Sequence, residues 1–166
     1  VKWPKVIDTT IIVLGVAMVV YNLVFTRTMF QGYIEHQDIH LMFALLLIFL
    51  SGIKKWPKFW PVFLVLIVAS LVTTGYIRIF YEDLEWRMGI PITADIIIGI
   101  ILLVICFEAT RQAFGWALPI VGLVFIAYAA FGQYLPQPLW HFPIPLKHMI
   151  AKYDIGLTGM FGMALG

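Results

Sequence analysis

Five long runs of apolar residues, separated by short polar segments, make up most of this chain. The clearest run lies at 91–111, and its centre, 96–107, carries no charged side chain. At about 1.5 Å of rise per residue, a helix over this run is about 30 Å long, the thickness of the hydrocarbon core of a bilayer. A helix that is apolar on every side is typical of a membrane span. The pattern therefore predicts an all-α integral membrane protein.

The apolar runs predict five transmembrane helices joined by polar links. We expect these helices at 7–26, 41–53, 62–80, 91–111 and 116–134. The second run is short for a bilayer, and it spans one only if its helix begins near Asp38 and continues to Lys54 or beyond. The segment before it, 27–40, is expected to be a polar interfacial loop.

The last segment, 147–166, has a different pattern. Its glycines recur every three or four residues, at Gly156, Gly159, Gly162 and Gly166. A strip of this kind allows close contact between two helix backbones. We therefore expect the start of a further, glycine-rich helix, with its partner in chain that continues beyond Gly166.

Polar residues mark both ends of the fourth run. Thr93 is expected to be the N-cap of its helix, with Asp95 in the first turn, where a carboxylate complements the helix dipole. Glu108 and Arg111 are spaced i, i+3, so they are expected to form an ion pair on one helix face. Ionisable residues inside a membrane are otherwise candidates for function. Because both carboxylates lie about one turn from the ends of the run, the structural interpretation is the stronger one: a capping role for Asp95 and an ion pair for Glu108.

The composition agrees with the membrane class and excludes several others. The chain of 166 residues is 62% hydrophobic and 12% charged, which leaves no room for a soluble domain of any size. Its net charge of +2 is too small to indicate a nucleic-acid partner. Its single cysteine, Cys106, cannot form a disulfide within the chain and is expected to be a packing residue.

The tetrapeptide Lys-Trp-Pro-Lys occurs twice, at 2–5 and at 55–58, each time just before an apolar run. Lysine favours anionic headgroups, tryptophan favours the membrane interface, and proline fits the start of a helix. We expect a set of interfacial anchors on one membrane face: Lys2, Trp3, Lys5, Lys54, Lys55, Trp56, Lys58 and Trp60. Because Arg27 is the only cation of the first opposite loop, the positive-inside rule predicts a cytoplasmic N-terminus.

The remaining polar residues offer little for catalysis. His36 and His40 are spaced i, i+4, which suits a shared metal or a haem, but their polar surroundings make an interfacial loop the simpler interpretation. His141 and His148 lie far along the chain. The chain has no glycine-rich phosphate loop and no nucleophile beside a base. We therefore expect no enzymatic activity, no metal site and no cofactor.

The link at 78–89 is amphipathic and carries the densest acidic cluster of the chain, Glu82, Asp83 and Glu85. The predicted topology places this cluster on the outer face. It is a candidate docking surface for a soluble partner. The alternative, which carries more weight, is a surface helix that lies at the headgroups.

An ordered set of short segments resembles a known family. It consists of Tyr-Glu-Asp at 81–83, Gly-Ile-Pro at 89–91, Asp95 with Gly99, Glu-Ala-Thr-Arg at 108–111, Gly-Trp-Ala-Leu-Pro at 115–119, Phe-Gly-Gln-Tyr-Leu-Pro at 131–136, and Gly-Met-Phe-Gly-Met-Ala-Leu-Gly at 159–166. Together these segments resemble the fused membrane subunit of a tripartite ATP-independent periplasmic (TRAP) transporter, and the TAXI subclass most of all.

The resemblance implies a domain organisation and a function. It implies a four-span unit similar to the small Q-type subunit at 1–112, a linking helix and periplasmic loop at 113–146, and the start of the large M-type transport domain at 147–166. The family takes up organic acids that a periplasmic binding protein delivers, driven by sodium that binds outside this segment. The implied location is the cytoplasmic membrane of a bacterium or archaeon. The alternative function is a haem-binding membrane anchor of a redox complex.

Overall fold

The structure is a computed structural model, and it describes residues 3–28, 32–86 and 92–134 together with the single residues 136, 137, 140 and 142. Within these residues all regular structure is helical. The long helices are α1 (Trp3–Thr28), α2 (Tyr33–Lys55), α3 (Trp60–Ile79), α5 (Thr93–Phe114) and α6 (Ala117–Phe131), with a short α4 (Tyr81–Trp86) and single 3₁₀ turns at Pro57–Phe59 and Gly132–Tyr134. Five helical segments are long and apolar enough to cross a membrane. The chain is an all-α membrane protein, as its apolar runs predict.

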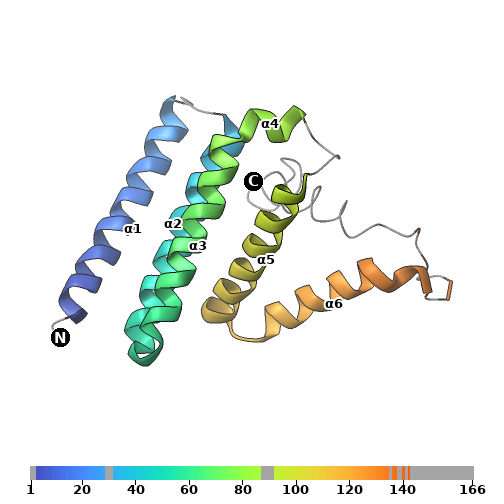
Figure 1. The fold of residues 1–166 in the computed structure, drawn as a ribbon. Coiled ribbons are helices and arrows are strands. Elements are labelled where there is room, and N and C mark those ends of the chain that lie inside the picture. The colour runs from blue at the N-terminus through green and yellow to red at the C-terminus, as the bar shows by residue number, and fades with distance from the viewer. Residues whose placement is uncertain are drawn as a thin grey trace.

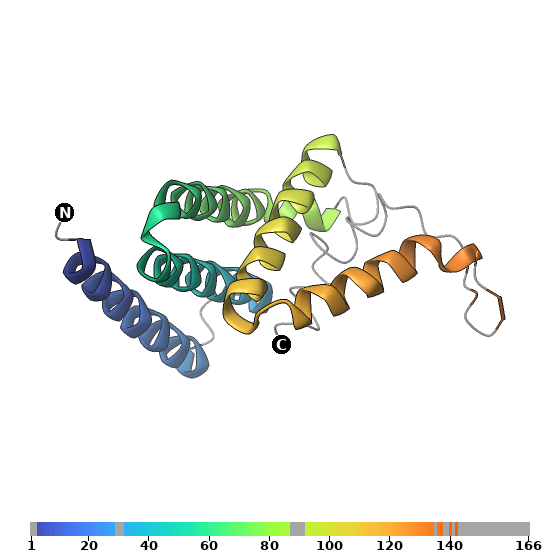
Figure 2. The same cartoon turned by 90° about the horizontal axis from the view of Figure 1, so that it is seen from below.

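The first three long helices stand side by side and alternate in direction, and α5 packs against α2 and α3 (Figure 1). The short connections between neighbours favour this antiparallel arrangement. The fifth long helix, α6, turns away from the bundle at a steep angle in both views (Figures 1 and 2). The turn is made at Gly115, whose φ of 80° lies in the left-handed region that favours glycine.

The core follows one stripe of α2. Leu41, Leu45, Phe49 and Ile53 recur every four residues, and each is at most 8% exposed. The stripe belongs to one core cluster with partners from four other helices: Ile7 of α1, Phe63 and Ile77 of α3, Leu84 of α4, and Leu102, Ile105 and Ala109 of α5. Helices α2, α3 and α5 therefore form the packed centre of the bundle.

The outer helices expose most of their apolar surface. In an apolar 18-residue stretch of each span, no residue of α1 is buried, 11% of the residues of the α6 segment are buried, and 39% of those of α2 are buried. Exposed valine and leucine side chains of this density have no counterpart on a water-soluble surface, and they are expected where lipid or another apolar partner surrounds the helix. The glycine at 122 lets α6 lie close to α5, because a Cβ there would be 3.2 Å from the ring of Phe107.

One predicted loop is wrong. The segment expected to be a polar link at 27–40 contributes the first two turns of α2, which begins at Tyr33. The Glu35 carboxylate accepts the backbone N–H of the N-cap residue, Gly32, at 3.1 Å and so starts the helix early. Glu35, His36, Asp38 and His40 are therefore helical, and the second span covers Glu35–Lys55, long enough for a bilayer.

The bundle has two ends of different character. The lysine end is the end that carries the described lysines, Lys5, Lys54, Lys55 and Lys58. The α4 end is the opposite one, where α1 finishes, α2 begins, α3 finishes and α5 begins (Figure 1). The glycine-rich segment expected at 147–166 lies outside the described residues, as does the boundary of the predicted third domain.

Candidate functional site

The most buried polar group of α5, Asp95, joins two helices at the α4 end. One of its carboxylate oxygens accepts the backbone N–H of Ile92 at 3.0 Å, and the other accepts the Tyr76 hydroxyl of α3 at 2.7 Å. Asp95 is only 2% exposed. Asp95 therefore caps its own helix and holds α5 against α3.

The predicted N-cap is wrong by one residue. The cap position is occupied by Ile92, and Thr93 is the first residue of α5. Ile92 has no side-chain acceptor, and the carboxylate of Asp95 at the third helical position instead accepts the backbone N–H of Ile92. The capping role expected for Asp95 is therefore confirmed, and the one expected for Thr93 is wrong.

At the other end of α5, Glu108 and Arg111 form a two-pronged ion pair. Glu108 Oε1 lies 2.6 Å from Arg111 Nη2, and Glu108 Oε2 lies 2.7 Å from Arg111 Nε. Gln112 Nε2 also donates to Glu108 Oε1, at 2.9 Å. The two charged side chains are 28% and 30% exposed, so this pair is only half buried and stays within one helix. It neutralises two charges at the membrane boundary without joining helices.

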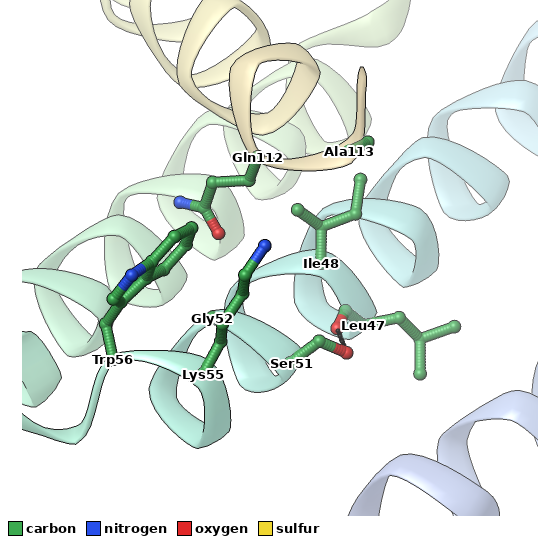
Figure 3. A pocket seen from close by; sticks show the side chains of 8 residues that line it. All are labelled: Leu47, Ile48, Ser51, Gly52, Lys55, Trp56, Gln112 and Ala113. Atoms are coloured by element: carbon green, nitrogen blue, oxygen red, sulfur yellow. Dashed lines mark hydrogen bonds between the residues drawn. The ribbon is translucent and has the colours of Figure 1, made fainter. Parts of the chain in front are cut away.

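A pocket of about 240 Å³ opens beside this ion pair, between the last turns of α2 and α5. Its walls are Leu47, Ile48, Ser51, Gly52, Lys55, Trp56, Gln112 and Ala113 (Figure 3). Gly52 lets the side chains of Gln112 and Phe63 approach the backbone of α2 closely. A Cβ at this position would lie 2.5 Å from Gln112 Oε1 and 2.6 Å from the ring of Phe63. Gln112 Oε1 is buried and receives no hydrogen bond from the part of the chain that the structure describes. The sequence patterns do not indicate this pocket, because its two walls are far apart in the chain.

The interfacial anchors that are described lie together at the lysine end. Lys54 Nζ lies 2.6 Å from Asp8 Oδ1, which joins the end of α2 to the start of α1. Lys55 Nζ lies 4.6 Å from the centre of the Trp56 ring. Lys5, Lys58 and Trp60 are exposed. Trp3 is the first residue of α1, and Lys2 lies outside the described residues. Both Lys-Trp-Pro-Lys copies therefore occur at the same end, and Asp8 is a partner that the pattern does not show.

The histidines of α2 pack against α1. The ring of His36 stacks on Phe25 with centroids 3.6 Å apart and lies 5.2 Å from the ring of Tyr21. His40 Nδ1 lies 3.3 Å from Asn22 Oδ1. No group of three histidine, cysteine or acidic side chains suited to a metal occurs among the described residues. His141 and His148 lie outside them.

Two buried polar residues of α2 are absent from the predicted site. Gln37 and Asp38 are 2% and 3% exposed. Among the described residues, both amide atoms of Gln37 and Oδ1 of Asp38 have no hydrogen-bond partner. The sequence spacing indicates the burial of Asp38, because this residue lies three positions before Leu41 and so extends the buried stripe of α2 by one turn.

The acidic cluster lies on α4. Glu82 and Asp83 occupy its first turn and are exposed, and Glu85 lies in the same helix. A carboxylate in the first turn of a helix complements the helix dipole. The short helix therefore presents acidic side chains beyond the end of the apolar span of α3.

Comparison of the chain with protein-family models, with characterised proteins and with solved structures finds no match.

Proposed function

We propose that this chain is the membrane frame of a sodium-coupled secondary transporter that takes up organic acids delivered by a periplasmic binding protein. Support comes from the ordered segments that resemble a TRAP transporter of the TAXI subclass. Further support comes from the arrangement of four spanning helices, α1, α2, α3 and α5, followed by a fifth that leaves the bundle. In this proposal the transport domain lies in chain after residue 147, and sodium binds there.

The observation that carries the proposal is that both carboxylates of α5 have fixed partners within the protein. Asp95 is saturated by a backbone N–H and the Tyr76 hydroxyl, and Glu108 is paired with Arg111 and Gln112. An ion or substrate path needs intramembrane carboxylates that can change partners. Carboxylates with fixed partners suit a rigid support. A frame of this kind holds a moving domain at constant depth in the bilayer.

The hydroxyl groups of α3 support the same interpretation. The side chains of Ser70, Thr73 and Thr74 are buried, and each donates to a carbonyl oxygen of its own helix at 2.7–3.0 Å. The proton of each hydroxyl is therefore satisfied within α3, and these groups need no hydrogen-bond acceptor on another helix. The centre of the α2, α3 and α5 unit is therefore proposed to be static during transport.

The two exposed sides of the bundle have distinct proposed partners. The apolar surfaces of α1 and α6 would face lipid or the transport domain. The acidic helix α4 would receive the binding protein at the outer face. The histidines of α2, which the alternative redox function would use, are engaged with Tyr21, Phe25 and Asn22 of α1.

The test is uptake by the native full-length protein in sealed vesicles. Its binding protein is added outside together with a panel of radiolabelled carboxylic acids. The proposal predicts uptake that needs both an inward sodium gradient and the binding protein, and that stops when the gradient is collapsed. Uptake independent of both would contradict the proposal. An absorbance spectrum of the purified protein with a haem Soret band would favour the redox alternative instead.

A further inference from the structure

The pocket between α2 and α5 has an apolar end and a polar end along the axis of α2. Leu47, Ile48 and Ala113 supply its apolar walls, with Leu47 and Ile48 about two turns of α2 deeper than Lys55. Lys55 and Trp56 stand at the end of the span, where interfacial residues belong (Figure 3). A ligand that fits this order has an apolar part towards the membrane centre and a polar part at the surface.

The polar groups in the pocket are not matched to one another. Lys55 has no ion pair among the described residues, and its ammonium group points towards the space that also receives the amide oxygen of Gln112 (Figure 3). Gln112 Oε1 is a buried acceptor without a donor in residues 3–28, 32–86 and 92–134. The Ser51 hydroxyl donates to the Leu47 carbonyl at 2.8 Å, so its oxygen remains an acceptor. The pocket thus offers one positive donor and two neutral acceptors.

We propose that this pocket binds the headgroup of an anionic glycerophospholipid that carries free hydroxyls, such as phosphatidylglycerol. The phosphate lies beside Lys55 and Trp56, a headgroup hydroxyl donates to Gln112 Oε1, and the acyl chains follow Leu47 and Ile48 into the bilayer. A choline headgroup has no hydroxyl or N–H to donate. An ethanolamine headgroup has a donor, but it brings a positive charge to an end that already holds Lys5, Lys55 and Lys58. The inference does not rest on the proposed transport function.

The test titrates the full-length protein in detergent with phosphatidylglycerol or phosphatidylcholine, and counts bound lipid by native mass spectrometry. Phosphatidylglycerol should bind more tightly than phosphatidylcholine. Lys55→Gln should weaken phosphatidylglycerol binding about fivefold, which corresponds to about 1 kcal/mol for one lysine near a phosphate. Ser51→Leu, which fills the pocket without a change of charge, should weaken it as well. Both residues are exposed, so neither change removes core packing.

The matched control is Lys58→Gln, which removes the same charge from the same end but outside the pocket. It should bind phosphatidylglycerol as the wild type does. Equal weakening by Lys55→Gln and Lys58→Gln would overturn the proposal, because the lipid would then respond to general charge. Displacement of the lipid by glycerol phosphate at a similar concentration would also overturn it, since the site would then take a soluble phosphate. Equal affinity for the two lipids would overturn the proposal as well, because the site would then select neither the negative charge nor the hydroxyls of the headgroup.

Discussion

The two ends of the bundle solve the problem of polar groups in a membrane in different ways. At the α4 end, Asp95 is 2% exposed and its hydrogen bond to Tyr76 joins α5 to α3. At the lysine end, the Glu108–Arg111 pair stays within α5, and the Lys54–Asp8 pair between α2 and α1 has side chains that are 56% and 43% exposed. Burial strengthens the first contact, while water and headgroups screen the others.

The same contrast applies to charge. Five of the described lysines and arginines lie at the lysine end, namely Lys5, Lys54, Lys55, Lys58 and Arg111, whereas Arg27 and Arg78 lie at the α4 end. Most of the described acidic residues lie at the α4 end. The lysine end is therefore suited to contact with anionic headgroups, and the α4 end to tight interhelical contacts and an acidic surface. The comparison leads to predictions of decreasing size.

The largest expected effect is at Asp95. The change Asp95→Ala leaves the Tyr76 hydroxyl and the Ile92 N–H without their acceptor, and it should lower the free energy of unfolding by about 3 kcal/mol. The matched control is Asp8→Ala, which removes an exposed ion pair and should cost at most about 1 kcal/mol. Reversible unfolding in mixed detergent micelles measures both. Equal losses would mean that the two ends do not differ as described.

The next effect concerns the close contact between α2 and α5 at the lysine end. In Gly52→Ala the new Cβ meets Gln112 and Phe63 at 2.5 and 2.6 Å, so the helices must separate, at a cost of about 1–3 kcal/mol. Gly75→Ala in α3 is the control, because nothing lies within 4 Å of its Cβ. That control should be neutral or slightly stabilising, since alanine favours a helix. A Gly52→Ala protein as stable as wild type would show that the contact is loose.

The coupling between Glu108 and Arg111 should be smaller than either. Removal of one partner leaves the other side chain charged, half buried and unpaired, whereas removal of both partners leaves no unpaired charge. Glu108→Gln and Arg111→Gln should each lower the melting temperature in detergent. The double variant should be less impaired than the sum of the two, by about 0.5–1 kcal/mol. Strict additivity would show that the pair contributes nothing to stability.

These three positions show how far the sequence leads. The existence of five spans and the pair at Glu108 and Arg111 follow from local patterns, because helix periodicity and i, i+3 spacing are local properties. The contacts of Asp95 with Tyr76 and of Lys54 with Asp8 do not follow from such patterns, because each partner lies on another helix. The start of α2 at Tyr33 does not follow from the pattern either, because its first turns are polar and the burial of Gln37 and Asp38 depends on the neighbouring helices.

The acidic surface of α4 should have the smallest effect and only on rate. Reversal of Glu82, Asp83 and Glu85 to lysine should slow uptake with the binding protein roughly threefold at low ionic strength, which is less than about 1 kcal/mol of barrier. More salt should narrow the difference, because the Debye length falls to about 8 Å near 0.15 M. Binding protein affinity measured in parallel serves as the control. Equal uptake at every salt concentration would leave α4 as a headgroup helix.

The central claim is that the two ends face opposite sides of the membrane, with the lysine end in the cytoplasm. Its most direct test is thiol labelling in intact cells, with single cysteines in a Cys106→Ala background. Cysteines at Lys5 and Lys58 should be shielded from an impermeant reagent and become reactive after permeabilisation. Cysteines at Thr28 and Gln137 should react at once. Labelling at position 58 in intact cells, with protection at position 28, would contradict the account.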